Sequence, residues 1–301
     1  MSCLAEASRN PGFDNYRFIY DNVENGNDIN LETLFGKRTA DRIKSPSYAE
    51  DGTPINSRRI EDFFYNIDDQ IKLSEKTNQP FIYILDSQDG LYSVAEEQKF
   101  DEHKKAAREG KTDVAGSYGD GKAKKNSEGL RKLMDRLRST ESILIVISQT
   151  RDNIGSRFGG RTRSGGHALK FYAYLEIWSS VLGQITKTVR GKERPIGVHV
   201  KVDLRKNRRT GFLFSITSDI YPSYGIDDIG SCVDFLVKEK WWAKSGNTIN
   251  ATEFGFSGVR SKLIDHIETN KLQKEVKKIT GACWRDILDG MNLHRQPKYN
   301  D

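Results

Sequence analysis

The sequence contains little that a disulfide or metal framework would need. Its only cysteines are the three residues Cys3, Cys232 and Cys283, which are odd in number and widely spaced. They therefore indicate neither a disulfide framework nor a cysteine metal cluster, and we expect a reducing cytoplasm as the setting. The five histidines show no ligand-like spacing with cysteines or carboxylates. A structural zinc site is consequently not expected.

Long apolar runs are also missing. No segment approaches the roughly 18 consecutive apolar residues that a membrane-spanning helix needs. The first residues lack the basic-then-apolar order of a signal peptide. We therefore expect a soluble, intracellular protein with no membrane partner. Charged residues make up 30% of the chain and the net charge is +6, a bias that suits nucleic-acid binding but is also common in ordinary soluble proteins.

The stretch from Ser142 to Tyr174 is the most informative part of the chain. Its β-branched run Ile143 to Ile147 predicts a buried strand that delivers Ser148 and Gln149 at its carboxyl end, where open α/β sheets bind their ligands. A long segment rich in glycine and arginine follows, with Arg151, Gly155, Arg157, Gly159, Gly160, Arg161, Arg163, Gly165 and Gly166. Such a loop is uncommon unless it is functional or disordered. Arginines on a glycine-rich backbone suit a polyanion, and a solvated surface loop is the alternative.

The order of short motifs in this stretch resembles a known family. The motifs are Gln149-Thr150-Arg151, Ile154-Gly155, Phe158-Gly159 and Gly165-Gly166-His167-Ala168-Leu169-Lys170-Phe171-Tyr172. They are similar, in order and without a gap, to the second DNA-binding loop of bacterial and phage RecA-type recombinases. A looser resemblance runs from about Phe18 to about Leu288. It implies an α/β fold with a RecA-like core of mainly parallel sheet flanked by helices over residues 1–223, and a small α+β domain over residues 224–301.

The resemblance also implies binding partners and a cellular location. The partners are single-stranded DNA and further copies of the chain in a helical filament. The location is the bacterial cytoplasm or, for a phage gene, the cytoplasm of the host. The implied DNA-binding residues are Ser127, Arg131, Arg151, Ile154, Arg157, Arg161, Arg163, Gly165 and Gly166. Ile154 would wedge between groups of bases, and Lys170 and Phe171 would lie at the filament interface. Charge on a helix face such as 127–138 is otherwise usually only solvated surface.

Two earlier strands end in carboxylates. Residues Tyr16 to Tyr20 predict a buried strand followed by Asp21 and Glu24, and Pro80 to Leu85 predict another that ends in Asp86. The resemblance implies that a glutamate at the first exit orients the attacking water, and Glu24 fits this role better than Asp21. It implies that Asp86 holds the magnesium shell of a bound ATP. Acidic residues at strand exits are also ordinary turn formers.

Three further residues are implied in ATP chemistry. Gln149 would sense the terminal phosphate. Lys206 and Arg208 would act on the nucleotide of a neighbouring protomer from the tip of a predicted hairpin, Ile196 to Leu204 with Phe212 to Thr217. A charged hairpin tip is ordinary when considered alone.

The remaining chain predicts helices, with one irregular segment. Apolar spacing indicates helices over 31–43, 60–77, 256–270 and 272–288 and a short hairpin over 241–249. Residues 94–126 are highly charged and glycine-bearing and take the place of the family's first DNA-binding loop, although the segment is longer. The pair Trp241 and Trp242 is interpreted as core packing rather than a base-stacking platform.

A complete phosphate-binding loop, GxxxxGK[ST], is missing. The nearest match, Gly116 to Ala123, ends in alanine instead of a hydroxyl residue and lacks a preceding strand. By the resemblance, the chain is expected to begin just after the family's P-loop. Either this loop lies on another polypeptide or exon, or nucleotide cleavage has been lost while DNA binding is kept. The isolated chain is expected to show no ATPase activity.

The predicted function is that of a recombinase, or its downstream fragment, which binds single-stranded DNA for strand exchange in recombination and repair. ATP and magnesium would be used if a P-loop is supplied. One alternative is a non-catalytic, filament-associated paralogue. Another is a helicase-type ATPase core, against which the string from Gly165 to Tyr172 and the carboxyl-terminal domain argue.

Overall fold

The computed structural model describes residues 1–26, 29–109, 120–152, 161–163, 167–293 and 295, and the structural statements below concern these residues. The chain divides into two compact units, Met1–Tyr174 and Leu175–Asp301. The domain boundary expected between residues 223 and 224 stays a prediction.

A four-stranded, fully parallel sheet forms the centre of the first unit, in the order β2-β1-β5-β6. Its strands are β1 (Arg17–Asn22), β2 (Ile43–Lys44), β5 (Phe81–Asp86) and β6 (Ile143–Val146). Successive side chains of a strand point to opposite faces, so Tyr83 and Leu85 join one core and Ile82 and Ile84 join the other. The unbroken apolar sequence of β5 follows from this, because both faces are covered.

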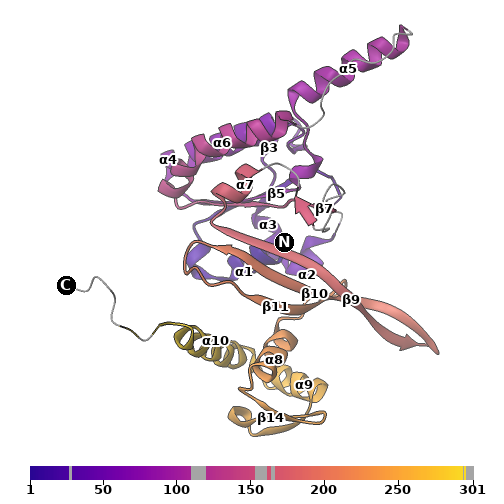
Figure 1. The fold of residues 1–301 in the computed structure, drawn as a ribbon, viewed down its shortest axis with the longest axis vertical. Helices are drawn as coiled ribbons and strands as arrows, with labels where there is room; N and C mark the ends of the chain where they lie inside the picture. Colours follow the sequence, from indigo (N-terminus) through magenta and orange to yellow (C-terminus); the bar gives the residue numbers. More distant parts are fainter. Residues whose placement is uncertain (27–28, 110–119, 153–160, 164–166, 294, 296–301) are drawn as a thin grey trace. The chain divides into compact units, whose positions relative to one another are not determined.

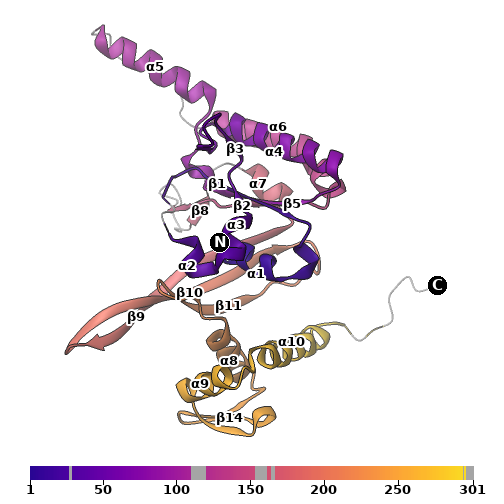
Figure 2. The same ribbon diagram turned by 180° about the vertical axis from the view of Figure 1, so that it is seen from behind.

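Helices cover the two faces of this sheet. Helices α4 (Ile60–Thr77) and α6 (Asp120–Ser139) lie side by side on one face, and α1 (Ser2–Arg9) and α3 (Lys37–Arg42) lie on the other (Figures 1 and 2). The predicted helix over 60–77 is confirmed at both ends. Its residues Phe63, Ile67 and Ile71 are fully or almost fully buried, as their near-3.6-residue spacing requires.

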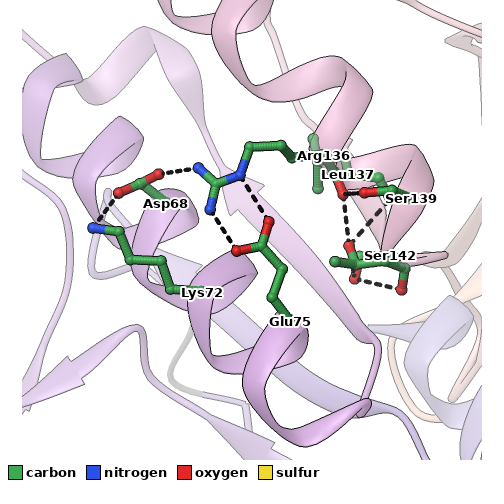
Figure 3. Close-up of polar contacts among 8 residues, drawn as sticks. Asp68, Lys72, Glu75, Arg136, Leu137, Ser139 and Ser142 are labelled. Atoms are coloured by element: carbon green, nitrogen blue, oxygen red, sulfur yellow. Dashed lines mark hydrogen bonds and ion pairs between the residues drawn. The ribbon is translucent and has the colours of Figure 1, made fainter.

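Ion pairs join α4 and α6 at their outer surfaces. The guanidinium of Arg136 donates to both carboxylate oxygens of Glu75 at 2.8 and 2.9 Å and to Asp68 at 2.5 Å, and Lys72 also contacts Asp68 (Figure 3). The two helices are therefore linked both through the apolar core and through this exposed network.

Two expectations for the first unit were wrong. A single helix over 31–43 is replaced by α2 (Leu31–Phe35) and α3, because Gly36 between them adopts a left-handed φ of 82°. Much of the charged segment 94–126 is helical: α5 (Val94–Arg108) starts at a capping box of Ser93 and Glu96 and projects away from the sheet (Figures 1 and 2). Strands β3 (Ser47–Tyr48) and β4 (Pro54–Ile55) form a small separate pair.

The segment after β6 starts and ends as short regular elements. Strands β7 (Thr150–Asp152) and β8 (Arg161–Arg163) pair antiparallel, and helix α7 (His167–Tyr172) follows. Residues 170–172 thus belong to a helix, and the next strand begins at Leu175.

An antiparallel sheet opens the second unit. Its order is β12-β11-β10-β9, with β9 (Leu175–Val189), β10 (Lys192–Asn207), β11 (Ser215–Tyr221) and β12 (Gly225–Ile226). The expected hairpin is confirmed as β10 and β11. The ribbon of β9 and β10 is longer than the sequence suggested and extends beyond the end of β11 (Figures 1 and 2).

The carboxyl-terminal part of this unit has its own core, built from three helices and a small sheet. These elements are α8 (Asp228–Lys238), β13 (Ala243–Ser245), β14 (Thr248–Ala251), β15 (Phe256–Val259), α9 (Arg260–Thr269) and α10 (Gln273–Gly290). The expected helix over 256–270 is partly wrong because its first four residues form β15. Trp242 is buried in this core and donates its indole N–H to Glu253 at 2.7 Å.

The α/β fold expected from the sequence is confirmed: a parallel sheet flanked by helices precedes antiparallel sheets. Among the helices that the structure describes, none combines the length and the apolar character that crossing a membrane requires.

Candidate functional site

Polar side chains from three strand exits meet at one edge of the parallel sheet. The Glu24 carboxylate accepts a hydrogen bond from Gln149 Nε2 at 3.1 Å and another from the Ser87 hydroxyl. Ser87 directly follows Asp86, to which it is joined by a cis peptide bond. Because β1, β5 and β6 are parallel, their carboxyl ends lie together. We refer to Glu24, Asp86, Ser87 and Gln149 as the strand-tip cluster.

Asp86 is held by the neighbouring strand. Its Oδ2 accepts from the Tyr20 hydroxyl at 2.6 Å, and its backbone carbonyl accepts from the Val23 amide at 2.8 Å. The side chain is only partly buried. Asp86 is thus fixed in orientation at the sheet edge while remaining in reach of solvent.

Gln149 connects this edge to the arginine-rich segment. Its backbone amide donates to Asp89 Oδ2 at 2.6 Å, while its side chain contacts Glu24. The next residue, Thr150, begins β7, which pairs with β8. Gln149 is therefore the residue directly before the pair of strands β7 and β8. Ser87 and Asp89 were not assigned from the sequence, although both follow Asp86 within three positions.

The other acidic residue, Asp21, lies within β1 rather than beyond its end and belongs to a closed network. Its carboxylate accepts from the Ser57 amide at 2.8 Å, the Ser57 hydroxyl at 2.6 Å and the Tyr83 hydroxyl at 2.6 Å, and it is fully buried. Burial raises the pKa of Asp21, although the hydrogen bonds from Ser57 and Tyr83 oppose this. Burial beside Asp21 also raises the pKa of Tyr83 well above its ordinary value. Asp21 has no free access to a ligand, in contrast to the exposed Glu24.

The expected DNA-binding residues fall in two groups. Ser127 and Arg131 lie on the exposed side of α6, one turn apart, while Leu130 and Leu133 bury its opposite side. Arg151, Arg161 and Arg163 lie in β7 and β8. Ile154, Arg157, Gly165 and Gly166 lie outside the described residues.

The remaining expected residues lie on short elements. Lys170 and Phe171 are exposed on α7, where the Phe171 ring packs edge-on against Tyr172 with centroids 5.1 Å apart. Lys206 lies near the end of β10 and Arg208 follows it in the hairpin tip. Asn207 between them orders this tip, because its Nδ2 donates to the Phe212 carbonyl at 3.0 Å and its Oδ1 accepts from the Arg209 amide.

The donor set fits one side of a magnesium nucleotide. The Glu24 carboxylate contacts the side-chain amide of Gln149, and the partly buried Asp86, bonded to the Tyr20 hydroxyl, offers a carboxylate of the type that magnesium takes as a ligand. The side-chain amide of Gln88 and the Ser148 hydroxyl, which flank the cluster in sequence, are buried without a hydrogen-bond partner. No group of three His, Cys, Asp or Glu side chains that could bind a bare metal ion occurs in the described part. Since the chain has no GxxxxGK[ST] motif, the opposite, phosphate-binding side has no P-loop from these residues.

Comparison with known proteins agrees with this architecture. The family model of the RecA N-terminal domain matches residues 104–227. Over this segment the chain is similar to the RecA family. Protein RecA from Rickettsia bellii (strain OSU 85-389) is 30% identical over 197 residues, which cover 64% of this chain and 56% of that protein. Protein RecA from Rickettsia prowazekii is 31% identical over 189 residues, or 60% and 54% of the two chains. The chain therefore spans little more than half the length of these relatives.

Proposed function

We propose that this chain binds single-stranded DNA and acts in DNA strand exchange during homologous recombination and repair, as part of a helical filament. Similarity to the family supports the proposal, and so does the link between the strand-tip cluster and the arginine-rich segment through Gln149. Use of ATP and magnesium is part of the proposal on the condition that a P-loop comes from another segment or polypeptide.

The proposed DNA site combines the exposed side of α6 with the segment Arg151 to Gly166. Ser127 and Arg131 would contact the DNA backbone, and Arg151, Arg157, Arg161 and Arg163 would neutralise phosphates. Ile154 would separate groups of bases. Lys170 and Phe171 on α7 would contact the next protomer.

The proposed nucleotide site assigns one task to each strand exit. Bound ATP would supply the phosphoryl group, and magnesium would supply the positive charge that shields it. Glu24 would orient the water, Asp86 would hold the metal shell and Gln149 would contact the terminal phosphate. Lys206 and Arg208 would place positive charge on that phosphate from an adjacent protomer, where charge stabilisation matters most.

The DNA-binding proposal can be tested with fluorescence anisotropy on a labelled single-stranded oligonucleotide. Changing Arg151, Arg157, Arg161 and Arg163 together to Ala should weaken binding by at least about tenfold and reduce its salt dependence, because fewer counterions are released. Changing Lys187, Arg190, Lys192 and Arg194 of the β9–β10 ribbon to Ala is a matched control that removes the same charge. Equal affinities of the two variants at the same salt would mean that the segment is not the site.

The coupling role of Gln149 can be tested in protein complemented with a P-loop. Gln149→Ala should keep most of the DNA affinity without nucleotide, yet lose DNA-stimulated hydrolysis and the tightening on DNA that ATP causes. The reason is that residue 149, which directly precedes the paired strands β7 and β8, would lose its contact with Glu24. The uncomplemented chain should show no ATPase activity. Hydrolysis by that chain, abolished by Asp86→Ala, would contradict the assignment.

The first alternative, a paralogue that joins recombinase filaments without turning over nucleotide, makes a different prediction. Filaments would then form only when an active recombinase is added, and Asp86→Ala would leave them unchanged. A helicase-type ATPase would instead unwind duplex DNA in the complemented protein.

A further inference from the structure

We infer that Asp89 is a positioning residue for the arginine-rich segment: its carboxylate holds the main chain of Gln149, so that the strand pair β7 and β8 is set for DNA before any nucleotide binds. The inference rests on the proposed function and names the residue that controls the same DNA site in the absence of ATP. It starts from an acidic side chain that lies directly beside a segment proposed to bind a polyanion.

Asp89 bonds to the backbone at the point where β6 passes into β7. It lies in a single 3-10 turn, Gln88–Gly90, that follows β5. Its Oδ2 accepts a hydrogen bond from the backbone amide of Gln149 at 2.6 Å. Hydrogen bonds to an ionised carboxylate are shorter and roughly twice as strong as bonds between neutral groups. This bond therefore fixes the main chain of Gln149, whereas the contact with Glu24 at 3.1 Å fixes its side chain.

The turn that carries Asp89 is itself held on two sides. On the β6 side, the Gln88 amide donates to the Ile147 carbonyl at 2.9 Å. On the β1 side, a Cβ placed on Gly90 would lie 2.9 Å from Val23 Cγ1, which is closer than such carbons approach in proteins, so the turn packs directly against the chain leaving β1. The Asp89 side chain therefore extends from a fixed backbone, and its carboxylate can serve as an anchor.

The strand pair beyond Gln149 depends on where it is attached. Strands β7 and β8 have three residues each and form a two-stranded sheet of their own, without backbone pairing to the parallel sheet among the described residues. A two-stranded ribbon is at best marginally stable by itself in water. Strand β7 begins at Thr150, one residue after the anchored amide. The bond to Asp89 thus fixes the start of the ribbon that carries Arg151, Arg161 and Arg163.

Burial does not explain this hydrogen bond. Gln149 is exposed, so its amide could bond to water at little cost if Asp89 were absent. The carboxylate also carries a charge of the same sign as DNA, which repels phosphates at close range. A carboxylate at this place is unfavourable for DNA binding unless it orders the chain that binds. Positioning and repulsion therefore predict effects of opposite sign when Asp89 is removed.

Two carboxylates divide the control of Gln149. Under the proposed function, the side chain of Gln149 leaves Glu24 for the terminal phosphate when ATP binds. The bond to Asp89 involves only the main chain, so it can persist through that exchange. Asp89 thus sets the affinity for DNA without nucleotide, and the contact with Glu24 sets how that affinity responds to nucleotide.

The test measures binding of the full chain to a labelled single-stranded oligonucleotide by fluorescence anisotropy without nucleotide. Asp89→Ala should weaken binding at least about fivefold, because the Gln149 amide loses a charge-assisted acceptor. Asp89→Asn keeps an oxygen that can accept this bond and removes the charge, so it should bind at least as tightly as the parent. Asp51→Ala is the matched control and should leave binding unchanged: Asp51 also accepts a backbone hydrogen bond, from Thr53 at 2.9 Å, but lies in the turn between β3 and β4.

Amide exchange followed by NMR reports on the anchor directly. The Gln149 amide should exchange faster in Asp89→Ala than in the parent, and Asp89→Asn should restore slow exchange. Urea denaturation should give the same free energy of unfolding for the three proteins, because Asp89 is partly exposed and outside the core. A residue with a merely structural role would instead lower stability and leave the DNA affinity of the folded chain unchanged.

Two outcomes would overturn the inference. One is binding by Asp89→Ala that equals or exceeds that of the parent, because the carboxylate would then only repel DNA. The other is a loss of affinity that Asp89→Asn shares, because the loss would then not follow the hydrogen bond. A parent chain that does not bind the oligonucleotide would contradict the proposed function itself, and exchange of the Gln149 amide would then decide separately whether Asp89 fixes this backbone.

Discussion

Two acidic residues, Asp21 within the last part of β1 and Glu24 just after this strand, show how position decides what a carboxylate can do. Asp21 is enclosed by Ser57 and Tyr83 beneath the sheet edge, whereas Glu24, three residues later, is exposed and contacts Ser87 and Gln149. The two side chains have the same chemistry. The buried one has all its donors supplied by the protein, so it stabilises the fold, while the exposed one is available to a ligand.

The largest expected difference between these regions is in stability. Asp21→Ala removes the acceptor of three buried hydrogen bonds and leaves the Ser57 amide and the Tyr83 hydroxyl without a partner. Its free energy of unfolding should fall by about 3 kcal/mol. Urea denaturation monitored by circular dichroism measures this. A loss below about 1 kcal/mol would mean that the network does not stabilise the sheet edge.

The second largest difference is expected in how the stability contributed by the buried carboxylate of Asp21 depends on pH. Because burial raises the pKa of Asp21 in the folded state, the folded chain holds this proton more tightly than the unfolded chain does. The free energy of unfolding that this tighter proton binding contributes is fully present below the ordinary Asp pKa of about 3.9. It is lost as the pH rises through the pKa that Asp21 has in the folded chain. Asp21→Asn, which cannot ionise, should lack this decline in urea titrations at successive pH values. Parallel pH profiles for the two proteins would contradict the raised pKa.

An exposed ion-pair network should show a smaller effect than the buried one. Arg136 bridges Glu75 and Asp68 between α6 and α4 (Figure 3), but 33% of its side-chain surface is exposed. In a double-mutant cycle of Arg136→Ala and Glu75→Ala, the coupling energy should be about 0.5–1 kcal/mol. Added salt should reduce it. A coupling energy larger than the loss of unfolding free energy in Asp21→Ala would reverse the ranking of buried and exposed contacts.

The smallest effect is expected at the exposed carboxylate. Glu24→Ala should change the free energy of unfolding by less than about 0.5 kcal/mol, because Glu24 is exposed and its partners can bond to water instead. Thermal denaturation of Glu24→Ala and Asp21→Ala, measured side by side with the parent chain, compares the two losses of stability. A large loss would show that the strand-tip cluster is a structural network and would weaken its proposed role in catalysis.

Several local patterns were sufficient to predict the fold. Apolar residues at helical spacing from Ile60 to Ile71 correctly predicted α4 and both of its ends. The run of apolar residues before Asp86 correctly predicted β5. Other features were missed although they carry a local signal. The capping box of Ser93 and Glu96 marks the start of α5, and Gly36 marks the break between α2 and α3.

Other errors had no clear local signal. The residues of β15, Phe256–Val259, precede α9 without a strong break in the apolar pattern, and pairing with β14 decides their extended conformation. The length of β9 likewise depends on its partner β10. Both pairings are with the adjacent strand in the chain, but the extended conformation depends on cross-strand contacts, so propensity alone does not determine it.

The sequence by itself determined that β1, β5 and β6 are strands with polar residues at their carboxyl ends, because apolar runs and their polar exits are local properties. Only the tertiary structure decided that Glu24 contacts Gln149 while Asp21 is sealed beneath Tyr83. It also decided that β6 pairs with β5 and is the last strand of the parallel sheet within the part of the chain that the structure describes. The physical reason is that burial and pairing are set by which strands become neighbours, and that order depends on contacts between residues far apart in the chain.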